Sequence, residues 1–74
     1  MKQETRIAKG YTQLETIMES IEGTKKGLWL TCPKKLRYVY LTFERIPIVN
    51  VGLAKHEFHS FSEAINYILE FLYN

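Results

Sequence analysis

The sequence predicts an α+β fold in two layers, with an N-terminal helix, a three-stranded antiparallel sheet and a C-terminal helix (α-β-β-β-α). Three observations carry this prediction. Apolar residues recur at helical spacing in both terminal thirds of the chain, apolar and polar residues alternate in the middle third, and glycine or proline stands at the junctions. Two helices laid on one face of a small sheet are a standard way to bury such patterns.

The first helix is expected from about Thr5 to Glu22. Gly10 weakens the helix pattern and marks an alternative, later start, while Gly23 is suited to the position that follows a helix end. The expected buried stripe consists of residues that recur at steps of three and four: Ile7, Tyr11, Leu14, Ile17, Met18 and Ile21.

Three strands are expected in the middle of the chain, over Leu28–Thr31, Leu36–Arg45 and Ile48–Leu53. Pro33 ends the first, and a short connection at Ile46 and Pro47 makes the other two a hairpin. Residues 54–59 are expected to form an extended or looped link. In the second strand Val39, Leu41 and Phe43 alternate with Tyr38, Tyr40 and Thr42, and Val49, Val51 and Leu53 are expected to join the hydrocarbon face.

The last helix is expected to begin at Ser60 and continue to Tyr73. Ser60 and Glu63 have the spacing of a capping box, in which a hydroxyl and a carboxylate each satisfy a backbone N–H of the first turn. Tyr67, Phe71 and Tyr73 extend its apolar surface beyond what one sheet face covers. The helix therefore needs a second neighbour, either the first helix or another subunit.

Length and composition define a single small domain over residues 1–74. The apolar share of 46% and the aromatic content exclude a disordered chain. A domain of this size has little core, so a protein partner or a homodimer is expected. A lone cysteine, Cys32, and the lack of a recognisable targeting or membrane-spanning segment favour a cytoplasmic protein with no membrane contact.

Basic residues are concentrated in the middle of the chain. Residues 24–45 carry a net charge of +5, whereas residues 46–74 carry −2 when histidine is counted as neutral. If both helices cover the Val39 face of the sheet, the opposite face is left open. That face is expected to hold Tyr38, Tyr40, Thr42, Asn50 and, with the matching register, Trp29.

This open face is interpreted as a nucleic-acid-binding site, for single-stranded DNA or RNA with weak sequence preference. Bases would stack on the aromatic rings while basic side chains hold the phosphates. The residues assigned to the site are Trp29, Tyr38 and Tyr40 with Lys25, Lys26, Lys34, Lys35, Arg37 and Arg45. The alternative is a protein-interaction or regulatory module, a small subunit of a complex or a homodimer, that uses the same face.

The sequence does not predict an enzyme, a cofactor or a small-molecule substrate. Cys32 lacks an evident base and orienting group, and there is no glycine-rich phosphate loop. His56 and His59 with Cys32 do not have the paired spacing of a metal site, so no metal is expected and structural roles are assigned to all three.

From residue 28 onward, three strands followed by a helix that begins with Phe58, Ser60, Glu63 and Ala64 resemble two families. These are the DNA-binding domains of ethylene-responsive transcription factors and the N-termini of some integrases. The resemblance covers about 47 residues. It implies a sheet that enters the major groove, but Tyr38 and Tyr40 stand where those sheets carry arginines. This departure favours single strands or backbone contacts over reading of duplex sequence.

Overall fold

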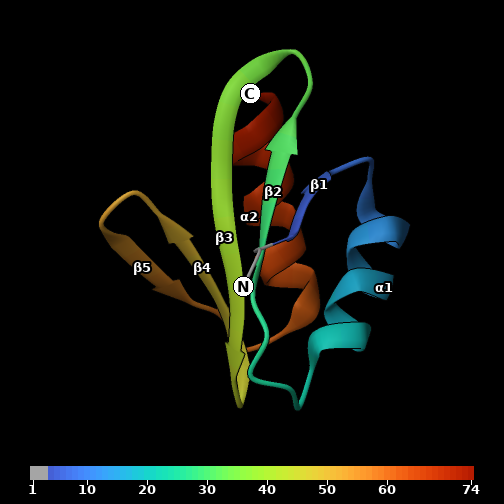
Figure 1. The fold of residues 1–74 in the computed structure, drawn as a ribbon, viewed down its shortest axis with the longest axis vertical. Helices are drawn as coiled ribbons and strands as arrows, with labels where there is room; N and C mark the ends of the chain where they lie inside the picture. The colour runs from blue at the N-terminus through green and yellow to red at the C-terminus, as the bar shows by residue number, and fades with distance from the viewer. Residues whose placement is uncertain (1–3) are drawn as a thin grey trace.

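The computed structural model describes residues 4–74 and has an α+β architecture (Figure 1). The α+β class and the helix at each end of the sequence are confirmed, but the sheet is larger than predicted. The elements in chain order are β1 (Glu4–Ile7), α1 (Tyr11–Ile21), β2 (Leu28–Cys32), β3 (Lys35–Glu44), β4 (Ile46–Val51), β5 (Ala54–Glu57) and α2 (Phe61–Tyr73). Neither helix in residues 4–74 is long and apolar enough to cross a membrane.

The five strands form one mixed sheet in the order β1-β2-β3-β4-β5. β1 pairs with β2 in parallel, and every other neighbouring pair is antiparallel. In the register of the central strands, Leu30 lies opposite Val39, and Leu41 lies opposite Val49. All four side chains are buried, so one face of the sheet is hydrocarbon, as the alternation predicts.

Both helices pack on this hydrocarbon face. One core joins the buried residues of α1 and α2 with those of β2, β3 and β4, and α1 also contacts α2 directly. In Figure 1, α2 runs behind β2 and β3, with α1 beside it. The helix contributions to the core are Leu14, Ile17, Met18 and Ile21 from α1, and Ala64, Ile65, Ile68 and Leu72 from α2.

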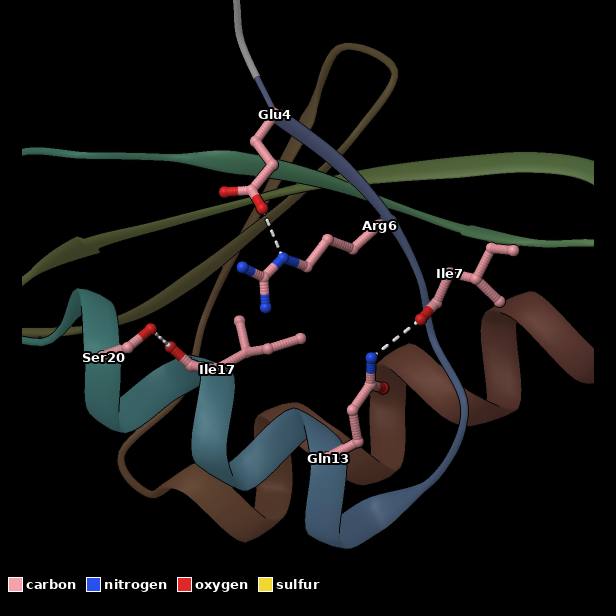
Figure 2. A network of polar contacts seen from close by, with 6 residues as sticks. All are labelled: Glu4, Arg6, Ile7, Gln13, Ile17 and Ser20. Carbon is pink, nitrogen blue, oxygen red and sulfur yellow. Dashed lines mark hydrogen bonds and ion pairs between the residues drawn. The ribbon is translucent and has the colours of Figure 1, made fainter.

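The first helix is shorter than predicted, because it begins at Tyr11 after Gly10 and residues 4–7 form β1. The alternative start at Gly10 was therefore the correct one. Gln13 closes the connection between β1 and α1. Its amide donates to the carbonyl of Ile7 at 2.9 Å and accepts from the backbone N–H of Lys9 at 2.8 Å. Figure 2 shows the first of these bonds, with the Glu4–Arg6 ion pair on the same strand.

The β3–β4 connection differs from the predicted proline turn. Glu44 pairs with Ile46, so Arg45 alone makes the turn, with a φ of 77°. That is the left-handed region, which non-glycine residues adopt only at a cost. Pro47 lies inside β4 opposite Phe43, where its carbonyl accepts from the Phe58 N–H at 3.0 Å.

The predicted link after β4 contains a fifth strand. Gly52, with a φ of 59°, and Leu53 form the turn of a β4–β5 hairpin, and Asn50 lies opposite Lys55. Leu53 was expected on the hydrocarbon face, but it is fully exposed at this turn. The hairpin extends away from the helices in Figure 1.

The last helix begins where the sequence predicts, and Ser60 caps it. The Ser60 hydroxyl accepts from the Glu63 N–H at 3.2 Å. The carboxylate of Glu63 accepts from that same hydroxyl rather than from a backbone N–H, so half of the predicted capping box forms. The extra aromatic surface of α2 is partly covered from within the chain, because the Tyr67 ring lies 4.9 Å from His56 and 5.4 Å from Phe58.

Candidate functional site

The face of the sheet opposite the helices carries side chains from all five strands. We call it the open face. Strand register places its residues in three rows across the sheet, which are Ile7, Thr31 and Tyr38; Thr5, Trp29, Tyr40, Asn50 and Lys55; and Thr42, Ile48 and Glu57. Trp29, Tyr38, Tyr40, Thr42 and Asn50 therefore share one face, as the sequence alternation predicts.

Trp29 and Tyr40 form the aromatic centre of the open face. Their ring centroids are 4.9 Å apart, with the ring planes inclined by 49°. This tilted arrangement is a favourable one for aromatic pairs, and it leaves Trp29 36% exposed. The pair therefore offers an ordered ring surface to solvent.

Gly27, just before β2, makes room for Tyr40. A Cβ atom at residue 27 would lie 2.5 Å from the Tyr40 hydroxyl oxygen, 2.6 Å from Tyr40 Cζ and 2.8 Å from Thr42 Cγ2. Real Cβ atoms do not approach other atoms so closely. The outer end of the Tyr40 ring therefore lies directly against residue 27, and glycine is the residue that leaves room for it.

Apolar side chains extend the aromatic centre towards β1 and towards the β2–β3 turn. Tyr38 is 50% exposed and Ile7 44% exposed, both in the row next to Trp29 and Tyr40. Leu36, near the start of β3, is 95% exposed. Large exposed apolar side chains gathered on a face that neither helix covers are a common mark of an interaction surface.

A cavity of about 850 Å³ lies at the other end of the open face, beside the β3–β4 turn. Three basic side chains from separate segments border it: Lys25 before β2, Arg45 at the turn and Lys55 on β5. Its remaining walls are Tyr40, Thr42, Phe43, Glu44, Ile48 and Asn50. Tyr40 thus belongs to both the aromatic centre and the cavity.

The charges around the cavity are only partly neutralised. The Lys55 ammonium lies 3.7 Å from carboxylate oxygens of both Glu44 and Glu57. Lys25 and Arg45 make no ion pair with any residue from 4 to 74. Ile48 is only 2% exposed although it lies outside the main core, so the cavity has an apolar floor. Asn50 is fixed there by a 3.1 Å bond from its amide to the Tyr40 carbonyl.

Two of the basic residues assigned to the site from the sequence lie on the helix-covered face instead. Arg37 donates to the Phe71 carbonyl at 2.7 Å, and its guanidinium lies 5.6 Å from the Phe71 ring centroid. Lys35 donates to the Tyr73 carbonyl at 3.4 Å. Both cations thus stabilise the C-terminal end of α2, where backbone carbonyls lack helical partners and the helix dipole favours positive charge.

The other assigned basic residues are divided between the two ends of the sheet. Lys34 is exposed in the turn between β2 and β3, at the opposite end from the cavity. Lys26 is exposed in the α1–β2 connection next to Lys25, but it does not border the cavity. The structure therefore brings together Trp29, Tyr38 and Tyr40 with Lys25 and Arg45, and it separates Lys34, Lys35 and Arg37 from the cavity.

Lys55 borders the cavity but was not singled out from the sequence. Residues 54–57 could have been predicted as a strand that follows a turn at Gly52. Side chains alternate between the two faces of a strand, so Lys55 and Glu57 would then lie on the same face. Asn50, which lies opposite Lys55 in the hairpin, was already expected on the open face.

Cys32 and the two histidines occupy separate surroundings. Cys32 is buried at the end of β2, His56 lies against Tyr67, and His59 is exposed. In the described residues, no group of three or more His, Cys, Asp or Glu side chains could hold a metal ion. Burial raises the pKa of Tyr73, and the charge and hydrogen bond of the neighbouring Cys32 raise it further.

Comparison of the chain with protein-family models, with curated proteins and with solved structures gives no match. Any functional assignment therefore depends on the chain's own residues and their arrangement.

Proposed function

We propose that the open face binds single-stranded nucleic acid, with bases stacked on its aromatic side chains and phosphates held at the basic cavity. One observation carries the proposal. The exposed aromatic residues Trp29 and Tyr38 and the basic residues around the cavity lie on the same face of the sheet, which neither helix covers, and Tyr40 joins the two groups.

Stacking is supported by the exposure and order of the rings. Trp29 is fixed against Tyr40, and Tyr40 is fixed over Gly27, so these rings lose little freedom when a base is added. Base stacking on an aromatic side chain contributes about 1–3 kcal/mol per base and tolerates any sequence. It requires unpaired bases, which favours single strands over duplexes.

Phosphate contact is supported by Lys25 and Arg45, which have no carboxylate partner among residues 4–74. Arginine and lysine at the edge of a stacking surface are the usual means of following a nucleic-acid backbone. Lys35 and Arg37 are excluded from the proposed contacts, since they bond the α2 carbonyls.

The test is a titration of a fluorescent single-stranded oligonucleotide of about eight nucleotides at low salt. Tyr38→Ala should weaken binding about fivefold or more, because it removes one stacking surface. Tyr11→Ala is the matched control, since Tyr11 is 39% exposed but lies on α1, away from the open face. Equal affinities of the two variants, or no binding by the parent protein, would contradict the proposal.

A second candidate is docking of a protein partner on the same face. It is favoured by Ile7 and Leu36, whose exposed aliphatic side chains extend the aromatic surface and have no use in stacking. A Leu36→Ser substitution separates the candidates, because it should weaken a protein complex and leave oligonucleotide affinity within about twofold. Light scattering on the free protein reports whether that partner is a second copy of this chain.

A further inference from the structure

We infer that the cavity at the β3–β4 end of the open face is a subsite for one nucleotide unit, with Lys25 and Arg45 as the phosphate ligands. Lys55 is inferred to act as a positioning residue that keeps Glu44 and Glu57 from repelling the phosphate. The inference rests on the proposed function, which it deepens by separating one open cavity, as a subsite, from the aromatic stacking surface.

The charge arrangement points to an anion. Lys25, Arg45 and Lys55 come from segments far apart in the sequence, yet all three border one cavity. Lys55 is shared between two carboxylates at 3.7 Å each, which leaves the other two cations without a partner among residues 4–74. The three cations outnumber the two carboxylates by one, and a concave surface with a net positive charge attracts an anion more strongly than the same charge on a flat surface does.

The rest of the lining points to an organic phosphate rather than a simple anion. The buried Ile48 and the Tyr40 ring offer apolar and aromatic contact, while Thr42 and Asn50 offer hydroxyl and amide groups. A volume of about 850 Å³ lies in the range of sites that enclose small organic ligands. A nucleotide combines a phosphate with a planar base and a hydroxylated sugar, so it matches all three kinds of lining.

Lys55 has a role that its charge alone would not predict. Because it is already paired with Glu44 and Glu57, its main effect on a bound phosphate is to offset part of the negative charge of those two carboxylates. Lys55→Ala should therefore weaken phosphate binding in the parent protein but have little effect once Glu44→Gln and Glu57→Gln are present. A Lys55 that contacted the phosphate directly would still be needed in that background, so Lys55→Ala would weaken binding there as well.

The experiment follows backbone amide shifts by NMR during titration with four ligands: a nucleoside monophosphate, the matching nucleoside, inorganic phosphate and a single-stranded oligonucleotide. The nucleoside monophosphate should bind more tightly than either the nucleoside or inorganic phosphate. The largest shifts should fall at residues around Lys25, Arg45 and Asn50. Equal binding of nucleoside and nucleoside monophosphate would overturn the assignment of a phosphate site.

Arg45→Gly is the most informative variant, because glycine adopts the φ of 77° without strain and the fold should be retained. It should weaken nucleoside monophosphate binding about fivefold, as should Lys25→Ala. Lys9→Ala is the charge-matched control, since the exposed Lys9 lies in the β1–α1 connection and does not border the cavity. Unchanged affinity in both Arg45→Gly and Lys25→Ala would overturn the subsite.

The ligand set also separates the subsite from the proposed function. Binding of the oligonucleotide with none of the monophosphate would overturn the subsite and leave the proposed function standing. Binding of the monophosphate with none of the oligonucleotide would support the subsite and overturn the proposed function. Failure of both ligands would overturn both, and a loss of affinity on adding Lys55→Ala to the Glu44→Gln and Glu57→Gln variant would overturn the positioning role.

Discussion

The hydroxyl oxygen of Tyr40 lies within 2.5 Å of the point that a Cβ atom on Gly27 would occupy. This packing fixes the one ring that belongs both to the aromatic centre and to the cavity. Gly27 does not have a positive φ, so the requirement for glycine is set by space alone.

Gly27→Ala should therefore displace Tyr40 and destabilise the protein by about 1–3 kcal/mol, the usual cost of overpacking. The measurement is the free energy of unfolding in urea, together with the near-ultraviolet circular dichroism of the Trp29–Tyr40 pair. Gly10→Ala is the matched control, because apart from its own and adjacent residues nothing lies within 4 Å of the added methyl group. Equal stabilities of the two variants would contradict this account of Gly27.

Arg37→Ala should lower stability by about 1–3 kcal/mol, because it removes a charged hydrogen bond to the Phe71 carbonyl and a contact with the Phe71 ring. It should leave oligonucleotide affinity within about twofold, since Arg37 lies on the helix-covered face. Thermal unfolding and the oligonucleotide titration together check this. A large loss of oligonucleotide affinity without a loss of stability would show that Arg37 contacts the nucleic acid.

The folded protein should lose stability at alkaline pH because the Tyr73 phenol ionises. Its pKa is raised in the folded protein above the ordinary value of 10.0, chiefly by burial, so the fold favours the neutral phenol. A group with a raised folded pKa contributes stability that is fully present below the unfolded pKa and is lost as pH rises through the folded pKa.

The check is the free energy of unfolding between about pH 8 and pH 11 for the parent and for Tyr73→Phe. The variant should be less stable at pH 8, because it loses the hydrogen bond from the Tyr73 hydroxyl to the Ala8 carbonyl. Its stability should then fall less steeply above pH 10 than that of the parent. Parallel curves would show that Tyr73 does not contribute to the alkaline loss.

The helices and the central strands could be predicted because their apolar residues follow a clear period. The residues of the open face in β3 could be predicted from the same alternation. It places Tyr38, Tyr40 and Thr42 on the face of the sheet that does not hold Val39 and Leu41. The same period also puts Lys35 and Arg37 on the Val39 face. Strict use of the alternation would therefore have directed both cations towards the helices.

The two edge strands were missed because neither has an apolar pattern. β1 (ETRI) is exposed along its whole length, and β5 (AKHE) is almost as exposed. β1 is held by its backbone pairing with β2, by the bond from the Ala8 N–H to the Thr31 carbonyl at 2.9 Å, and by Gln13. These contacts do not require apolar residues at regular intervals, so no periodic pattern in the sequence indicates them.

The cavity was missed for a related reason. It depends on a one-residue turn at Arg45, a position with positive φ where glycine or asparagine would have been the recognisable signal. It also depends on β5, which delivers Lys55. Sequence reasoning placed the turn at Pro47, which lies within β4.

The central claim is tested most directly by the fluorescence of Trp29, the only tryptophan in the chain, during titration with a single-stranded oligonucleotide at low salt. The account predicts that stacking quenches Trp29 and that affinity falls steeply as salt is raised. Lys25→Ala should reduce the slope of log affinity against log salt by about one. Trp29 fluorescence that does not change, or a binding constant insensitive to salt, would contradict it.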